Sequence, residues 1–119
     1  MSELRLFHNP RCSKSRAALA AVQEAGVDAE VVEYLKTPLD ESALRDILAV
    51  LEDEPSALVR RDPAFKTAGL TADDVRTPEQ VAAVLAAHPA LMERPLLVRS
   101  DRAIIGRPTE RVAPFVAGA

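Results

Sequence analysis

The chain has few aromatic residues, few glycines and a single cysteine. Its 119 residues include no tryptophan, one tyrosine and three phenylalanines, which argues against the aromatic platforms on which single-stranded nucleic acids stack. One cysteine permits no internal disulfide. The glycines form no phosphate-binding loop, and two histidines with one cysteine give no metal-ligand spacing. Disulfide-stabilised, nucleotide-loop and metal-site classes are therefore not indicated.

Long apolar runs and a basic charge balance are also missing. No apolar run approaches the ~20 residues that a membrane span needs. The net charge of −3 gives no general attraction to nucleic acid or to anionic lipid. The opening residues Met-Ser-Glu-Leu-Arg lack the pattern of a secretory or transit signal. We therefore expect residues 1–119 to form one cytoplasmic domain without a nucleic-acid or membrane partner.

The cysteine, Cys12, lies between an apolar segment, Leu4–His8, and an alanine-rich stretch with helical periodicity. A helix N-terminus presents free backbone N–H groups and partial positive charge, which stabilise an anion. Arg11, Lys14 and Arg16 add cations nearby. A lone cysteine is otherwise most often a small core residue. In this setting, however, cysteines have pKa values below the usual thiol value of about 8.5, so the pattern predicts a reactive thiolate.

The spacing of apolar residues and turn signals predicts the order of the elements. A strand, a helix and a second strand come first, then mainly helical segments, and finally a hairpin and a last helix. These elements are expected at Leu4–His8, Ser13–Ala25, Glu30–Tyr34, a helix after Asp40, a short helix Ser56–Arg60, a helix after Thr77, strands Leu96–Arg99 and Arg102–Gly106, and a helix from about Pro108. This is the order of an α/β thioredoxin-like fold with a four-stranded mixed sheet and a helical insertion at about residues 40–90.

The topology also predicts which loops meet. If the hairpin pairs beside the first strand in antiparallel sense, the end of the first strand lies at the same sheet edge as the start of the third and the end of the fourth. Cys12, Arg94, Pro95 and Arg107 would then converge there.

Several short motifs occur in one order along nearly the whole chain. They are His8-Asn9-Pro10-Arg11-Cys12-Ser13-Lys14-Ser15-Arg16, Tyr34-Leu35-Lys36-Thr37-Pro38, Leu58-Val59-Arg60-Arg61, His88-Pro89, Glu93-Arg94-Pro95-Leu96-Leu97-Val98 and Gly106-Arg107-Pro108. In these motifs and in their order, the chain resembles the glutaredoxin-coupled arsenate reductase (ArsC) family. The resemblance implies that Cys12 attacks arsenate, that Arg60, Arg94 and Arg107 hold the oxyanion, and that the bond before Pro95 is cis.

The arginines suit such a substrate chemically. Arsenate carries several negative oxygens, and the planar guanidinium fork donates paired, charge-assisted hydrogen bonds to such groups. Arg61 is a less suitable candidate than Arg60. The remaining arginines we considered are interpreted as solvated surface charges: Arg45, Arg76 and Arg111.

Other polar residues near the motifs have more than one interpretation. His8 either stabilises the thiolate or moves a proton as a catalytic residue, or it is a structural histidine at a strand end. Ser15 either donates a hydroxyl hydrogen bond to the thiolate or is an exposed or capping serine. His88 is interpreted as a cap or packing residue.

A single cysteine has a consequence for the chemistry. A dithiol enzyme resolves its own intermediate with a second cysteine, which this chain lacks. The resemblance implies that glutathione, as co-substrate, attacks the adduct of Cys12 with arsenate and that glutaredoxin then reduces the mixed species. No bound cofactor is expected, and the partners are arsenate or a similar oxyanion, glutathione and glutaredoxin.

Two other functions stay open. The first is an arsenate reductase-like monothiol oxidoreductase that acts on a mixed disulfide or another oxyanion. The second is a regulator similar to the Spx proteins, which share the fold and bind RNA polymerase. Regulators of that type often carry Cys-x-x-Cys, which Ser15 interrupts here.

Overall fold

The computed structural model describes residues 4–117. The strands are β1 Leu4–His8, β2 Ala29–Glu33, β3 Leu96–Arg99 and β4 Arg102–Ile105. The α-helices are α1 Ser13–Glu24, α2 Glu41–Val50, α3 Pro63–Thr67, α4 Pro78–Ala87 and α5 Val112–Ala117. Short 3-10 helices lie at η1 Pro55–Leu58, η2 Ala72–Val75, η3 Pro89–Leu91 and η4 Thr109–Arg111.

The strands form a four-stranded mixed sheet in the order β2-β1-β3-β4. β1 pairs with β2 in parallel, with Leu6 opposite Val31. β3 pairs with β1 in antiparallel sense, with Leu97 opposite Leu6, and β4 continues the hairpin. The sheet and the element order confirm the predicted thioredoxin-like fold with its helical insertion.

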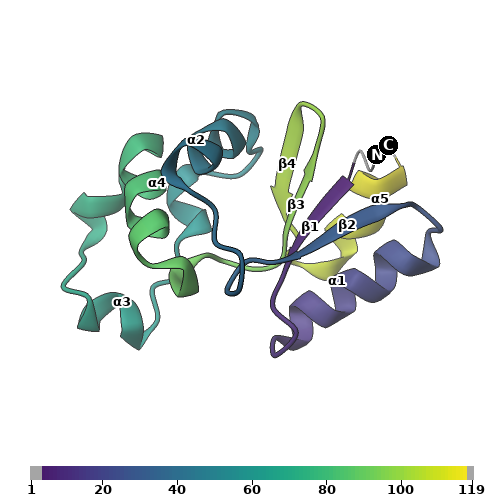
Figure 1. Cartoon of the computed structure of the whole chain (residues 1–119), viewed down its shortest axis with the longest axis horizontal. Helices are drawn as coiled ribbons and strands as arrows, with labels where there is room; N and C mark the ends of the chain where they lie inside the picture. The colour runs from purple at the N-terminus through teal and green to yellow at the C-terminus, as the bar shows by residue number, and fades with distance from the viewer. Residues whose placement is uncertain (1–3, 118–119) are drawn as a thin grey trace.

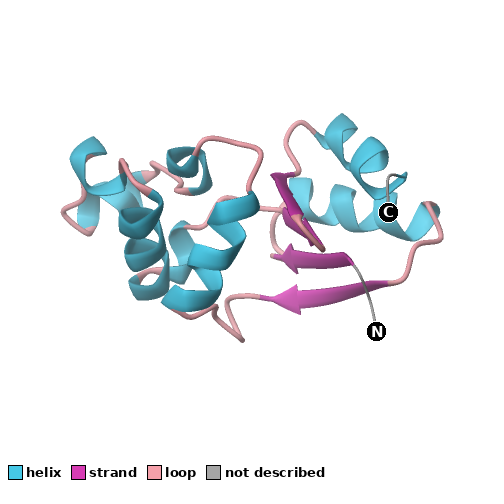
Figure 2. Ribbon diagram, turned by 90° about the horizontal axis from the view of Figure 1, so that it is seen from above, coloured by secondary structure: helices cyan, strands magenta, loops and turns pink. Residues whose placement is uncertain are grey.

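Side chains of the sheet alternate between two hydrophobic cores, as the period of a strand requires. Leu6 and Leu97 pack with α1 and α5 on one face, whereas Phe7 and Leu96 pack with the helical insertion on the other. Figure 1 shows the insertion on the left and the layer of α1 and α5 on the right, with the sheet between them. The same separation is visible from above in Figure 2.

The predicted starts of the insertion helices are confirmed. Asp40 caps α2 by accepting a hydrogen bond from the Ala43 amide at 2.7 Å. Thr77 and Gln80 form a reciprocal capping box at the start of α4, with Pro78 in the first helical position. His88 is the C-cap of α4, which agrees with its interpretation as a capping residue.

Some boundaries differ from the prediction because 3-10 turns replace α-helical ones. The segment expected as helix Ser56–Arg60 is η1, which begins at Pro55 and ends at Leu58. The last helix starts with η4 and becomes α-helical only at Val112. Within residues 4–117, no helix combines the length and the hydrophobicity that crossing a bilayer requires.

The peptide bond between Arg94 and Pro95 is cis, as the family resemblance implies, and so is the bond between Arg107 and Pro108. The two prolines lie at the ends of neighbouring strands, β3 and β4. Gly106 separates β4 from Arg107, and its amide donates a 2.9 Å hydrogen bond to the Pro95 carbonyl. The start of β3 and the end of β4 are therefore tied together.

Gly106 lies too close to its neighbours for a side chain. A Cβ atom there would lie 2.9 Å from Leu97 Cδ1 and 2.9 Å from the Pro95 ring, with Val112 at 3.3 Å. The first two contacts are shorter than normal van der Waals distances. The glycine therefore allows the Pro95 ring, β3 and the Arg107 loop to pack together.

We expect Gly106→Ala to lower the free energy of unfolding by about 1–3 kcal/mol, because the added methyl overpacks this junction. Urea denaturation followed by circular dichroism measures the change. Val31→Ile is the control, since it enlarges a side chain that is 43% exposed and should change stability by less than about 0.5 kcal/mol. Equal stabilities for Gly106→Ala and the parent would contradict the close packing.

Candidate functional site

Cys12 is the N-cap residue of α1 and is 9% exposed. Its backbone is extended, with φ −97° and ψ 122°, and its amide donates to the Asn9 carbonyl at 3.0 Å. The turn that Asn9 and Pro10 begin therefore delivers the thiol to the start of the helix, where N–H groups lack intrahelical acceptors. The predicted position of the cysteine at a helix N-terminus is confirmed.

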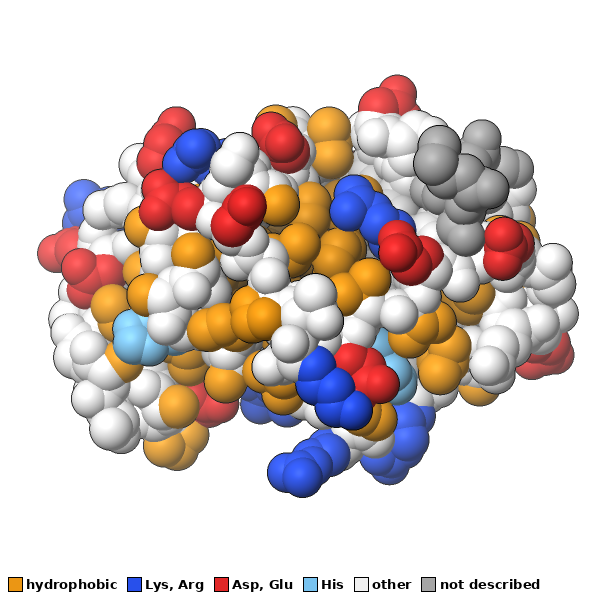
Figure 3. All heavy atoms as spheres, in the orientation of Figure 1, with side chains coloured by type: hydrophobic (Ala, Val, Ile, Leu, Met, Phe, Trp, Pro, Cys, Tyr) orange, Lys and Arg blue, Asp and Glu red, His pale blue; other side chains and the backbone are white. Residues whose placement is uncertain are grey.

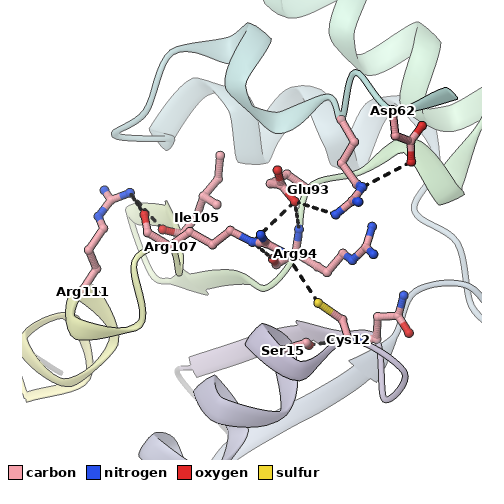
Figure 4. A network of polar contacts seen from close by, with 10 residues as sticks. Cys12, Ser15, Asp62, Glu93, Arg94, Ile105, Arg107 and Arg111 are labelled. Atoms are coloured by element: carbon pink, nitrogen blue, oxygen red, sulfur yellow. Dashed lines mark hydrogen bonds and ion pairs between the residues drawn. The ribbon is translucent and has the colours of Figure 1, made fainter. Parts of the chain in front are cut away.

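The surroundings favour the thiolate. Burial alone would raise the pKa of Cys12, but the backbone amides of Ser15 and Lys14 and the Arg94 guanidinium outweigh it and lower the pKa below its ordinary value. Arg107 Nη2 also lies 3.5 Å from the sulfur, within hydrogen-bond distance. Figure 4 shows this contact from Arg107 to Cys12.

The arginines come from three separate loops at this edge. Arg60 follows η1, Arg94 precedes β3, and Arg107 follows β4. Arg107 Nε donates a 2.7 Å hydrogen bond to the Arg94 carbonyl. Arg94 and Arg107 therefore meet at Cys12, as the topology predicts. Arg60 joins them through the carboxylate of Glu93.

Glu93, which the sequence did not mark as a site residue, lies among these arginines. Its Oε1 accepts hydrogen bonds from Arg60 Nη1 at 3.1 Å and from the Arg94 amide at 3.2 Å, and it lies 3.5 Å from Arg107 Nε. Asp62 forms a second, longer contact of 3.5 Å with Arg60 Nε. The only advance signal for Glu93 was its place next to Arg94 in the chain.

Some donors of the cluster are left without an acceptor. Among residues 4–117, the buried Nε atoms of Arg60 and Arg94 have no hydrogen-bond partner. Leaving a buried charged donor unsatisfied is unfavourable. The arrangement therefore has spare capacity to bind an anion.

Tyr34 is a further neighbour of the site that the motifs contained but did not assign. Its side chain is 2% exposed. Burial raises the pKa of its hydroxyl, which also experiences the charges of Arg94, Cys12 and Arg60. A buried phenol thus lies within electrostatic reach of the thiol and the arginines.

The interpretation of Arg111 as a solvated surface charge is wrong. Its Nη1 donates to Asp53 at 2.7 Å and to the Ile105 carbonyl at 2.9 Å, and it lies 3.4 Å from the Arg107 carbonyl. Asp53 also accepts from the Ile105 amide at 2.9 Å. The pair holds the end of β4 and the Arg107 loop against the helical insertion, because η4 turns Arg111 back toward β4.

The remaining arginines that the sequence analysis assigned to the surface, and Arg61, have partners outside the cluster. Arg45 and Arg76 are exposed and pair with nearby acidic residues on their own helical segments, as expected of surface charges. Arg61 lies over the Phe65 ring at 6.0 Å.

His8 and Ser15 form a buried pair behind the cysteine. His8 Nδ1 lies 2.6 Å from Ser15 Oγ, which also accepts from the Asn9 amide at 3.0 Å. Burial, opposed by Glu33 and aided by Arg16, lowers the pKa of His8. Neither interpretation of Ser15 holds: its side chain is buried, and its hydroxyl contacts His8 and Asn9 and not the thiolate. The Ser15 backbone amide is what helps to lower the pKa of Cys12.

The surface beside the cysteine loop is hollow, and charged residues of both signs line it. A pocket of about 290 Å³ is lined by His8, Asn9, Pro10, Arg11, Glu33, Leu35 and Lys36. Figure 3 shows lysine and arginine side chains at the lower edge of the molecule, where Figure 1 places the loop from β1 to α1. In the part of the chain that the structure describes, no group of three or more His, Cys, Asp or Glu residues is arranged to hold a metal ion.

Comparisons with known proteins agree with this geometry. The ArsC family profile matches residues 7–115. The chain is 44% identical to the arsenate reductase of Neisseria meningitidis, over 94% of this chain and 97% of that protein. It is 40% identical to the Escherichia coli protein named "Uncharacterized protein YfgD", over 96% of this chain and 97% of that one. The structure of an arsenate reductase from Vibrio cholerae superposes with a TM-score of 0.82 at 34% identity, covering 93% of this chain and 95% of that one.

We expect Cys12 to react with iodoacetamide at a lower pH than an ordinary thiol, because its folded-state pKa is lowered. The same protein unfolded in urea is the reference, and Cys12→Ser, which leaves no cysteine, is the blank. Reaction rates measured across pH give the two midpoints. Coincident midpoints for folded and unfolded protein would contradict the activated thiolate.

The lowered pKa also makes stability depend on pH. A thiolate that is favoured in the folded state adds stability that is fully present above the unfolded-state pKa and is lost as pH falls through the folded-state pKa. Urea titrations of the parent at a series of pH values should show this loss, and Cys12→Ser should lack it. A parent and variant with parallel pH profiles would contradict it.

Proposed function

Because the chain belongs to the ArsC family, we propose that it reduces arsenate to arsenite with Cys12 as the nucleophile. The observation that carries this proposal is the meeting of a thiol that favours its charged form with three arginine-bearing loops. Thiol chemistry alone does not require such a cluster. An oxyanion does, because it would otherwise be repelled by the thiolate.

In the proposed mechanism, arsenate binds between the sulfur and the guanidinium groups. Arg107 contacts the thiol and the Arg94 carbonyl, and the Arg94 guanidinium helps to lower the pKa of the thiol. The two arginines can therefore neutralise charge on the nucleophile and on the substrate together. Within residues 4–117, Arg94 Nε has no hydrogen-bond partner and Arg60 Nε has only the 3.5 Å ion pair with Asp62, so both guanidiniums can donate to a bound oxyanion. Attack by the thiolate then gives a Cys12–arsenate adduct and releases one substrate oxygen as water.

The proposed role of His8 is indirect. Its lowered pKa favours a neutral ring at physiological pH, so it contributes little positive charge to the thiolate. Its contact with Ser15 Oγ instead fixes the first turn of α1, whose amides bond to the sulfur. We therefore assign His8 as a positioning residue that acts through Ser15.

Reduction needs a second thiol from outside this chain. Conversion of As(V) to As(III) takes two electrons, which two thiols supply when they form a disulfide. The chain contains one cysteine, so an external thiol such as glutathione must attack the adduct, and glutaredoxin would then regenerate Cys12. The pocket beside Arg11 provides space for a small thiol close to the cysteine loop, and Arg11 adds a positive charge to its wall.

The experiment that tests the proposal is arsenate-dependent oxidation of NADPH by the purified protein, coupled through glutathione, glutaredoxin and glutathione reductase. A monothiol oxidoreductase acting on mixed disulfides would consume NADPH with a disulfide substrate but would not respond to arsenate. Capture of RNA polymerase without arsenate turnover would favour the Spx-like regulator instead.

Replacing Arg60, Arg94 or Arg107 by Ala is expected to lower kcat/KM for arsenate by about 10- to 100-fold, the equivalent of one charge-assisted hydrogen bond. Lysine replacements should recover only part of the loss, since they keep the charge but not the fork. Arg45→Ala, which removes an exposed arginine of α2, is the matched control and should retain parent activity. Parent-like turnover in all three alanine variants would refute the oxyanion assignment.

A further inference from the structure

Glu93 is held rigidly beside Arg60 by the backbone. Val59 and Met92 form an isolated antiparallel bridge, and both are buried. The amide of Arg60 donates to the Leu91 carbonyl and the amide of Glu93 donates to the Leu58 carbonyl, each at 2.7 Å. The loop carrying Arg60 and the loop carrying Glu93 therefore move as one unit.

The Glu93 carboxylate contacts two different loops of the cluster. One oxygen accepts from Arg60 Nη1 at 3.1 Å and lies 3.5 Å from Arg107 Nε. Arg107 uses a different nitrogen, Nη2, for its 3.5 Å contact with the sulfur. In Figure 4 the Arg107 guanidinium lies between Glu93 and Cys12. Glu93 and the thiol thus lie near different nitrogens of one guanidinium, and Glu93 can hold Arg107 in place without contacting the sulfur.

The carboxylate also changes the charge of the site. Repulsion between guanidinium groups that face one sulfur would spread them apart without a compensating anion. Glu93 supplies that anion, and it remains in place when no substrate is present. It also reduces the positive charge with which the site attracts anions of any kind.

We propose that Glu93 is a positioning residue of the oxyanion site, which orients the Arg60 and Arg107 guanidiniums and weakens the attraction of the site for dianions. The proposal rests on the proposed function in that the site is an oxyanion site. Glu93 acts through the arginines and does not itself touch the sulfur or the substrate. A carboxylate in an anion site weakens anion binding by its charge, but it also fixes the orientation of the arginine side chains.

The charge role is tested with Glu93→Gln, which keeps the shape and an oxygen acceptor but removes the negative charge. Sulfate is the probe, and its protection of Cys12 from iodoacetamide gives an apparent Kd without turnover. We expect that Kd to fall by about three- to tenfold, because a repulsive charge is removed. The pH midpoint of alkylation should also fall, since the arginines then act on the thiolate with less compensation.

The positioning role is tested with Glu93→Asp, which keeps the negative charge but shortens the side chain by one methylene and so moves the carboxylate away from the guanidiniums. We expect its alkylation midpoint to stay near that of the parent and its sulfate Kd to rise by about threefold or more, because Arg60 and Arg107 lose their brace. A merely structural residue would change stability in both variants without these opposite changes in Kd. Circular dichroism melts establish that each variant is folded.

Asp62→Asn is the matched control. Asp62 also pairs with Arg60, at 3.5 Å, but no ion pair joins it to Arg107 among the described residues, and Asn retains the N-cap of α3. Its alkylation midpoint should match that of the parent. Sulfate Kd values that are equal in the parent, Glu93→Gln and Glu93→Asp would overturn the proposal. A parent that fails to reduce arsenate but shows the sulfate shifts would retain the role of Glu93 and reject arsenate as the substrate.

Discussion

The antiparallel pairing of β3 with β1 sets Leu96 opposite Phe7, so the residues that precede β3 and those that follow β1 share one edge of the sheet. That register is fixed by burial, because a slip of one residue would turn Leu97 and Leu6 away from the core under α1 and α5. Arg94 and Cys12, more than eighty positions apart in the sequence, become neighbours through this pairing. The chemistry of the site thus depends on hydrophobic packing at some distance from any charge.

A second constraint is the balance between burial and charge at the sulfur. Burial disfavours a thiolate, whereas helix amides and arginines favour it, and the net pKa shift of Cys12 is downward. Two of the three arginines are in turn tied to the protein, Arg107 to the Arg94 carbonyl and Arg60 to Glu93. Because the guanidiniums are held by the fold, they need little reorganisation when an anion binds.

Much of the fold could be predicted from the sequence, because helix caps and strand periodicity depend on residues that are close together in the chain. The Thr77 to Gln80 capping box, the Asp40 cap and the alternating apolar strands are determined by residues a few positions apart. The convergence of Cys12, Arg94 and Arg107 followed from the strand order alone. The last helix begins near Pro108 as predicted, but its first turn is 3-10, which the sequence did not distinguish from an α-helical turn.

The partners of charged residues could not be predicted in the same way. A sequence shows that Arg111 is charged, but its contacts with Asp53 and the Ile105 carbonyl depend on how the insertion packs against β4. The contacts of Glu93 could not be predicted either, nor could those of the Ser15 hydroxyl, which contacts His8 and accepts a hydrogen bond from the Asn9 amide. These are contacts between segments whose relative placement emerges only from the complete tertiary structure.

The unpaired donors connect stability with binding. A buried guanidinium nitrogen without a hydrogen-bond acceptor, as Arg94 Nε is within residues 4–117, destabilises the free protein. An anion that accepts from it removes that penalty, so part of the binding free energy is the relief of an unfavourable feature of the empty site. A ligand that binds only the folded state stabilises it in proportion to its occupancy. In the ligand-free protein the donors are held in place by the pairing of β1 with β3, by the packing at Gly106 and by the contacts of Glu93.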